Sequence, residues 1–208
     1  MEREHVKCFH MTDFVSCHGE FEGWREKPGV RKRFLEDLQE CARKFTNKRF
    51  SASVVISDYN TVNDEFYLEE VFGRPYSFCG ISCIEHVRKW AKGRRHVNEL
   101  MFAFEDGDKD QGNFKTICKE RFRPKIKAAF LLKADYIPFQ AADLAAWKTR
   151  HPIREAVGDK DYTVEDVERL LSSTKKYLQA PHSGGVFDYD ALMKICRGYK
   201  IRQRESKR

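Results

Sequence analysis

Long apolar segments are missing from this chain. No stretch approaches the about 18 consecutive apolar residues that a membrane-spanning helix requires, so we expect no membrane partner. The first ten residues, MEREHVKCFH, also lack the apolar segment of a secretory signal peptide. Together these two absences predict a cytoplasmic protein.

Paired cysteine motifs are absent as well. The seven cysteines occur at irregular spacings, and no two of them form a Cys-x-x-Cys pair. Reduced thiols therefore fit the sequence better than a disulfide framework. A zinc site would have to use Cys8, His10, Cys17 and His18, whose spacing is looser than the paired spacing of structural zinc sites.

Two common catalytic signatures are also missing. The chain contains no glycine-rich phosphate loop of the Walker type. Nothing in it resembles a Ser-His-Asp arrangement. The sequence thus gives no support to a P-loop nucleotide hydrolase or a serine hydrolase.

Positive charge is in excess and is clustered. Lysine and arginine number 39 against 32 acidic residues, for a net charge of +7. The excess gathers in the segments RKWAKGRR (88–95), KERFRPKIK (119–127) and YKIRQRESKR (199–208). Basic segments with interleaved aromatics are typical of nucleic-acid binding, although solvated faces and a basic tail would give the same composition. The residues that we expect to contact phosphates are Arg88, Lys92, Arg94, Arg95, Arg121, Arg123 and Lys125.

Hydrophobic periodicity predicts alternating strands and helices. Strands are expected within 6–14, 51–60, 98–104 and 125–135. Helices are expected from Pro28 to Phe45, within 64–93 with a break near Gly73, within 112–122, and from Pro138 onward. This alternation predicts an α/β fold with a sheet covered by helices.

The C-terminal quarter has a different pattern. Amphipathic helices are expected within 163–178 and 188–200, separated by a glycine-containing link at 180–187. We therefore predict a core over residues 1–156 and a C-terminal helical extension over 157–208, packed on the same domain and ending in a basic tail.

The segment FEDGDKDQGNF (104–114) crowds four acids into six positions, namely Glu105, Asp106, Asp108 and Asp110. Neighbouring carboxylates repel each other, so the cluster requires solvent or a cation. A calcium loop of the EF-hand type is excluded, because Gln111 stands where glycine is needed and Ile117 where glutamate is needed. A polar turn that caps the following helix remains an alternative for one or two of the acids.

A magnesium or manganese site is the other interpretation of these acids. Carboxylates at the end of a strand suit a hard cation that also holds a phosphodiester. Such a site needs a further acid, and Asp143 stands in a helix otherwise made of alanine and leucine. Gln140, three residues earlier, lies on the same helical face. The alternative is an exposed aspartate on a partly buried helix.

Three segments together resemble domain-of-unknown-function family 3800, a widespread and mainly bacterial group. They are HMTDF (10–14) with GEFEGW (19–24), FEDGD (104–108) and FQAADL (139–144), and the resemblance covers about residues 6–150. It implies a ribonuclease H-like fold, a mixed sheet flanked by helices with a metal-dependent acidic site. It places Asp106 and Asp108 at the end of a central strand and Asp143 on a helix that closes the site. Glu105, Gln140 and Asp13 are second-tier candidates.

One feature of that family is missing. Its members usually begin with a strand ending in Asp-Glu-Ser-Gly, whose aspartate is the expected central metal ligand, and this chain has no such segment. The resemblance therefore implies a core that is incomplete at its N-terminus. A sheet without those strands has an unprotected edge, so we expect a homo-oligomer or a partner that completes the sheet.

Two functions follow as expectations. The leading one is a metal-dependent phosphodiesterase, nuclease-like, that uses Mg²⁺ or Mn²⁺ on nucleic acid. The alternative is a non-catalytic nucleic-acid-binding or assembly module, a truncated relic of the same fold.

Overall fold

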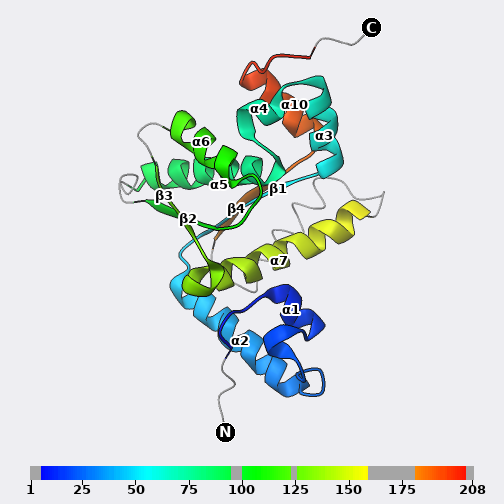
Figure 1. Ribbon diagram of the computed structural model, residues 1–208, viewed down its shortest axis with the longest axis vertical. Coiled ribbons are helices and arrows are strands. Elements are labelled where there is room, and N and C mark those ends of the chain that lie inside the picture. Colours follow the sequence, from blue (N-terminus) through cyan, green and yellow to red (C-terminus); the bar gives the residue numbers. More distant parts are fainter. Residues whose placement is uncertain (1–5, 95–99, 123–125, 159–180, 205–208) are drawn as a thin grey trace. The chain divides into compact units, whose positions relative to one another are not determined.

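The computed structural model of the chain describes residues 6–94, 100–122, 126–158 and 181–204 (Figure 1). Its elements up to the first strand are α1 (Met11–Ser16), η1 (Gly19–Phe21), α2 (Pro28–Phe45) and β1 (Arg49–Val54). There follow α3 (Ile56–Glu65), α4 (Leu68–Phe72), α5 (Pro75–Lys92), β2 (Met101–Glu105), α6 (Gln111–Arg121) and β3 (Lys127–Leu131). The last are η3 (Lys133–Asp135), α7 (Pro138–Gly158), β4 (His182–Phe187) and α10 (Tyr189–Gly198). No helix within the described ranges is long and apolar enough to cross a membrane.

The chain divides into two compact units. The first unit comprises residues 1–49 and 131–182, and the second comprises residues 50–130 and 183–208. None of the three borders between these segments (49/50, 130/131 and 182/183) lies at the expected division after residue 156, and α10 packs against α3, which follows β1.

The strands confirm a mixed α/β class but not the single sheet that we expected. They form two parallel two-stranded sheets, one of β1 with β4 and one of β2 with β3. In the first sheet the amide of Arg49 donates to Pro181 O (2.9 Å) and that of Val55 donates to Phe187 O (3.0 Å), so the register is the same at both ends. The link expected at 180–187 is therefore wrong, because residues 182–187 form β4, whose partner strand β1 lies far away in the sequence.

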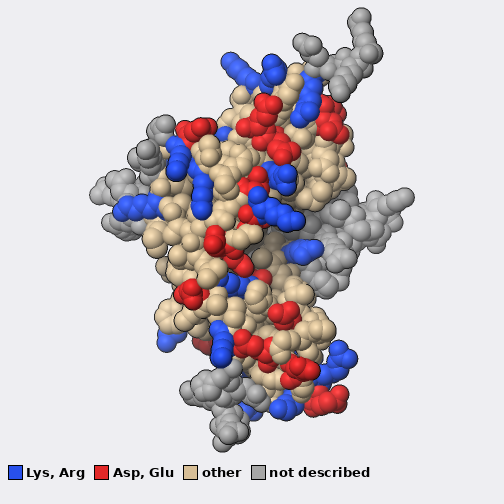
Figure 2. Space-filling view, viewed as in Figure 1, with Lys and Arg blue, Asp and Glu red and all other residues tan. Residues whose placement is uncertain are grey.

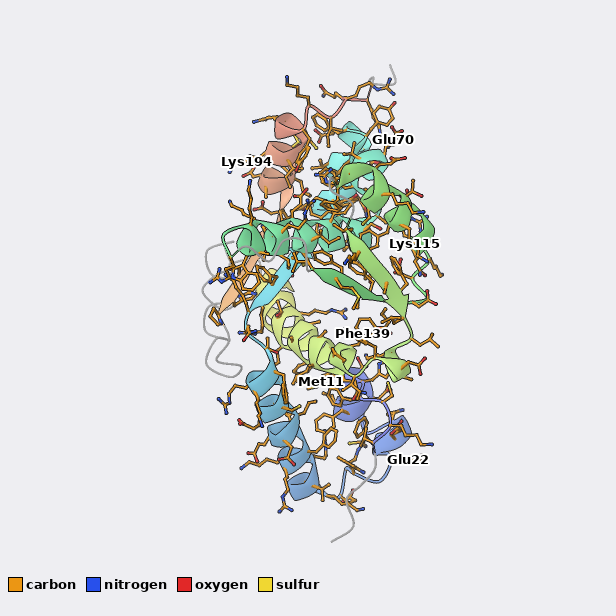
Figure 3. All side chains as sticks on the ribbon, turned by 90° about the vertical axis from the view of Figure 1, so that its left-hand side faces the viewer. Met11, Glu22, Glu70, Lys115, Phe139 and Lys194 are labelled. Carbon is orange, nitrogen blue, oxygen red and sulfur yellow. The ribbon has the colours of Figure 1, made fainter. Side chains whose placement is uncertain are left out.

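The strands of the second unit pack against α5 and α6. Phe187 at the end of β4 meets Phe78 near the start of α5 edge-on, with 5.0 Å between ring centroids. Phe104 at the end of β2 meets Phe114 near the start of α6 in the same way, at 4.8 Å. Each contact joins the end of a strand to the start of a helix, so β4 and α5, and likewise β2 and α6, run in opposite directions, as strand and helix do in β-α-β units. Figures 1 and 3 show both helices on the same side of the strands.

The helices α5 and α6 lie side by side and run in the same direction. Gly80 of α5 faces the ring of Phe114, and a Cβ at this glycine would lie only 2.8 Å from the ring's Cζ. Further along, the Arg88 guanidinium stands 5.2 Å from the centroid of Phe122, just past the end of α6. The N-terminal ends of the two helices therefore share one side of the unit, and their C-terminal ends share the other.

The cysteines are consistent with the expected reduced thiols. All seven lie in the described part of the chain, and none of them is in a disulfide. In α5, burial raises the pKa of Cys79 to about 12 and that of Cys83 to about 11. Both side chains are therefore neutral at physiological pH and serve as small apolar residues.

The first unit is built on an aromatic cluster. Phe9, Phe14, Phe21, Trp24 and Phe34 pack together, and Phe21 and Trp24 are only 1% and 3% exposed. Most of these ring pairs are edge-on or tilted, the arrangement that aromatic quadrupoles favour. The loop between α1 and α2 therefore contributes its aromatics to the core.

The other expected elements have mixed outcomes. The helices predicted at 28–45, 112–122 and 188–200 and the break near Gly73 are confirmed. The strand predicted at 6–14 is wrong, because the chain enters α1 at Met11, whose amide is held by the Asp143 carboxylate. The helix predicted at 163–178 lies outside the described residues.

Gly73, between α4 and α5, generates a testable prediction. Its φ of 72° and ψ of −169° belong to a region that only glycine occupies readily, and a Cβ there would lie 2.7 Å from Ser77 Cβ. We expect Gly73→Ala to lower the free energy of unfolding by about 1–3 kcal/mol in urea titrations. Gly112→Ala is the matched control, since a Cβ at Gly112 meets nothing within 4 Å. Equal stability of the two variants would contradict this account of the turn.

Candidate functional site

The acidic segment predicted to bind metal forms the turn between β2 and α6. Glu105, Asp106 and Asp108 are exposed, and Asp110 is half-buried. Gly107 at its centre has a φ of 107°, and the amide of Gln111 donates to Asp108 O (3.1 Å). The four acids thus occupy one tight turn, but they do not share one role.

Asp110 ties the start of α5 to the start of α6. It stands at the N-cap position of α6, yet its carboxylate accepts hydrogen bonds from the Arg74 amide (3.1 Å) and the Ser77 hydroxyl at the N-terminus of α5. A carboxylate at a helix N-terminus satisfies otherwise unpaired amides and interacts favourably with the helix dipole. Asp110 therefore has a structural role, as the turn-and-cap alternative implied.

The two helix N-termini also reduce the cost of the acidic cluster. Each helix carries about half a positive charge at its N-terminal end, and α5 and α6 both begin beside this turn. The repulsion within the carboxylate cluster, for which the sequence suggests solvent, a capped turn or a bound cation, is therefore partly offset by the protein itself.

Asp106 and Asp108, the first two predicted ligands, each accept a hydrogen bond through one carboxylate oxygen. Asp106 Oδ1 accepts a hydrogen bond from the Gln111 side chain, and Asp108 Oδ1 accepts one from the Asp110 amide (2.8 Å). The second oxygen of each carboxylate makes no hydrogen bond to a described residue. Glu105, the neighbouring second-tier candidate, is exposed at the end of β2.

Asp143, the third predicted ligand, belongs to the first unit and already has a cationic partner. Its Oδ2 accepts a hydrogen bond from the Met11 amide (2.8 Å) and lies 3.0 Å from Lys133 Nζ. The Lys133 side chain is 7% exposed and that of Asp143 is 31% exposed. The ammonium group of Lys133 therefore occupies one side of the carboxylate that was expected to face a metal.

Gln140, like Asp143, binds the segment that precedes α1. Its Oε1 accepts a hydrogen bond from the Phe9 amide (3.2 Å), so Gln140 and Asp143 both hold the segment that leads into α1. Lys133 Nζ also lies 2.9 Å from His10 Nδ1. Figure 3 shows Met11 beside the first turns of α7, near Phe139. This cluster fixes the N-terminal segment onto α7.

Asp13, the remaining second-tier candidate, is half-buried in the first turn of α1. Its backbone carbonyl accepts a hydrogen bond from the His18 amide (2.9 Å). A carboxylate in the first turn suits the helix dipole, which is a structural role.

The predicted ligands do not form a complete metal site within either unit. Asp106 and Asp108 belong to the second unit and Asp143 belongs to the first. Among the residues that the structure describes, no group of three or more His, Cys, Asp or Glu side chains is placed to hold a metal ion. Mg²⁺ is commonly bound through one or two carboxylates together with waters and substrate phosphates, so Asp106 and Asp108 could supply the protein ligands of such a site without Asp143.

The predicted phosphate contacts gather where α5 and α6 end. Lys92 and Arg94 are exposed there, and the Arg94 guanidinium lies 4.6 Å from the centroid of the Trp90 indole ring. Arg88 is half-buried against Phe122. Arg95, Arg123 and Lys125 lie outside the described residues.

Arg121 is a packing residue rather than an available phosphate contact. Its guanidinium lies 4.4 Å from the centroid of Phe72 and 4.6 Å from that of Tyr199, and Nη2 lies 2.8 Å from the Glu85 carboxylate. The side chain is 15% exposed. The prediction treated every arginine of the basic segment alike, whereas α6 turns this one toward the core.

Two basic residues that the prediction omitted are exposed at the same end, Lys89 and Lys119. Both stand in the last turn of their helix. Residues two apart on a helix lie on different faces, so the helical periodicity of the sequence could have distinguished exposed Lys119 from Arg121. We call this end of the two helices the basic end; it comprises Arg88, Lys89, Lys92, Arg94 and Lys119.

Comparisons with protein-family models, with curated proteins and with solved structures found no match for this chain.

The contact between Asp143 and Lys133 leads to a stability prediction. Asp143→Ala leaves a buried ammonium without its carboxylate and the Met11 amide without an acceptor, so we expect a loss of about 1–3 kcal/mol of unfolding free energy. The double variant Lys133→Met/Asp143→Ala should lose less than the two single losses combined. Urea titrations in EDTA measure both. A loss that appears only with Mg²⁺ would instead identify Asp143 as a metal ligand.

The roles assigned to the acidic turn can be separated by a matched pair of variants. Asp110→Ala removes the acceptor at the start of α5 and should cost about 1–2 kcal/mol of unfolding free energy. Asp106→Ala removes an exposed carboxylate and should change the free energy by less than about 0.5 kcal/mol. Thermal or urea unfolding without divalent cations provides the measurement. The reverse ranking would show that Asp110 does not cap α5.

Proposed function

We propose that this chain binds nucleic acid through the basic end of the second unit. The observation that carries the proposal is the parallel packing of α5 and α6. Because of it, two basic segments that are separate in the sequence end side by side. Figure 2 shows lysine and arginine side chains over the region where Figure 1 draws α6 and β3.

The positive charge at the basic end is larger than the charge that would offset the helix dipoles of α5 and α6. Basic residues in a last turn often only offset the helix dipole, which amounts to about half a negative charge per helix. At the end of α5 alone, Lys89, Lys92 and Arg94 are exposed, which is about three positive charges against about half a negative charge of the helix dipole. The surplus favours an external polyanion.

The aromatics within these segments favour recognition of the backbone rather than of the bases. Phe122 is 3% exposed, and Trp90 packs against Phe50 with 5.8 Å between ring centroids. Guanidinium groups lie against both rings. Because these rings offer little free surface for base stacking, binding should depend on phosphates and vary little with sequence.

We include the resemblance to family 3800 in this proposal of nucleic-acid binding. A ribonuclease H-like relative of family 3800 would carry a parallel β-α-β unit with acids at the end of its first strand, and β2, α6 and β3 provide such a unit. Each of the two sheets has two strands, so every strand has an edge without a described β partner. These edges support the expectation of a homo-oligomer or a partner that completes the sheet.

Metal-dependent cleavage of nucleic acid is the second candidate. The observation that favours it is the exposed position of Asp106 and Asp108 at the carboxyl end of β2, each with one carboxylate oxygen that makes no described hydrogen bond. Waters and the phosphate oxygens of the substrate would supply the remaining ligands of the ion.

Binding can be tested with a salt titration. For labelled duplex DNA and RNA, we expect Lys89→Gln/Lys92→Gln to weaken binding about tenfold and to reduce the slope of log K against log salt by about 2. Lys32→Gln/Lys44→Gln on α2 is the control, because it removes the same charge from exposed positions. Equal losses in the two variants would point to net charge alone, and unchanged binding in the first variant would exclude the basic end.

Cleavage can be tested on the same substrates with Mn²⁺. The binding module predicts intact substrate with both wild type and Asp106→Asn, while the affinity of both stays unchanged by EDTA. Cleavage by the wild type that is lost in Asp106→Asn would instead establish the metal-dependent phosphodiesterase.

A further inference from the structure

The side chain of His10 contacts a buried lysine. Its Nδ1 atom lies 2.9 Å from Nζ of Lys133, whose side chain is 7% exposed and also pairs with the Asp143 carboxylate at 3.0 Å. All three residues belong to the first unit. An ammonium group has hydrogens to donate and no lone pair, so Nδ1 of His10 is the acceptor in this hydrogen bond.

This contact fixes the protonation state of the imidazole ring. A ring nitrogen that accepts a hydrogen bond carries no proton, so the ring is neutral and its hydrogen is on Nε2. A proton on Nδ1 would place an N–H group against the N–H groups of Lys133 and would add a second positive charge beside the first. The surroundings of His10 therefore favour the neutral imidazole over the charged one.

The charged groups around His10 offer no carboxylate to balance that added charge. Lys133 comes from η3 and Asp143 from α7, and the Asp143 oxygen next to the lysine already accepts a backbone amide as well. Asp13 stands in the first turn of α1, and Glu20 of η1 accepts backbone amides from the segment before His10. Among the residues that the structure describes, no ion pair joins His10 to a carboxylate.

His10 also stands in the middle of the segment that α7 holds. The amides of its neighbours Phe9 and Met11 donate to Gln140 (3.2 Å) and Asp143 (2.8 Å), both on α7. The lysine that binds His10 is paired with the second of these acceptors. A positive charge that separates the imidazole from the lysine therefore acts directly on the hydrogen bonds that attach this segment to α7.

We propose that His10 is a pH-sensitive switch for the attachment of residues 6–11 to α7. At neutral pH the neutral imidazole binds Lys133 and the segment is held. In mild acid the imidazole takes up a proton from solvent at Nδ1, the hydrogen bond to Lys133 is lost, and the segment is released. Because the held form excludes this proton, lowering the pH shifts the equilibrium toward the released form. The switch lies in the first unit and does not depend on the basic end, which belongs to the second.

The test is hydrogen–deuterium exchange of the full chain, measured at the amides of Phe9 and Met11. Exchange is compared at about pH 7.5 and about pH 5.5, because histidines titrate in this range whereas carboxylic acids ordinarily stay ionised. After correction for the intrinsic pH dependence of exchange, we expect protection of both amides to fall about tenfold in acid. The Val55 amide, which donates to Phe187 O in the second unit, should keep its protection. Nitrogen chemical shifts should show the His10 hydrogen on Nε2 at the higher pH.

Three variants identify the titrating group. His10→Asn keeps an acceptor near the position of Nδ1 but does not titrate, so it should keep its protection in acid. Lys133→Met removes the repelling charge and should reduce the acid effect. His18→Asn changes an exposed histidine of the same unit and should behave as the wild type does.

The proposal is overturned if acid leaves the protection of the wild type unchanged, or if His10→Asn loses protection as the wild type does. It is also overturned if the nitrogen shifts show a proton on Nδ1 of His10 at about pH 7.5, a measurement that requires no variant to fold.

Discussion

The packing of α5 against α6 in the same direction is the contact on which the second unit depends. Gly80 leaves room for the Phe114 ring, and that ring in turn meets Phe104 of β2 and Phe130 of β3. One aromatic side chain thus joins two helices and two strands. Because both helices point the same way, the unit has one side where helices begin and another where they end.

That arrangement separates the charges of the chain. The acids that follow β2 lie where the helix dipoles are positive, and the basic segments lie where they are negative. The acidic cluster and two of the basic segments, which look like independent signals in the sequence, therefore lie at opposite ends of the same pair of helices. The basic end carries more charge than the dipoles of α5 and α6 offset, and the proposed function rests on that surplus.

In the first unit, an aspartate that suits a metal ion instead meets a lysine. The sequence shows Asp143 and Gln140 on one helical face among small residues, and both do act together, on the amides of Phe9 and Met11. Lys133 could not be identified as the partner, because the sequence places it at the end of a predicted strand. The chemistry of a carboxylate permits either cation, and only the fold selects between them.

The sequence by itself determined α2, α5, α6, α7 and α10, since their signals act over a few residues: the prolines that start α2, α5 and α7, the apolar stripes, and the break at Gly73 before α5. The tertiary structure alone decided that residues 182–187 form a strand, that α1 begins at Met11 and that Arg121 faces the core. Strand pairing and charge pairing join residues far apart in the chain, such as Met11 with Asp143 and Arg49 with Pro181. Local periodicity carries no information about such partners, because these contacts form only when the chain has folded.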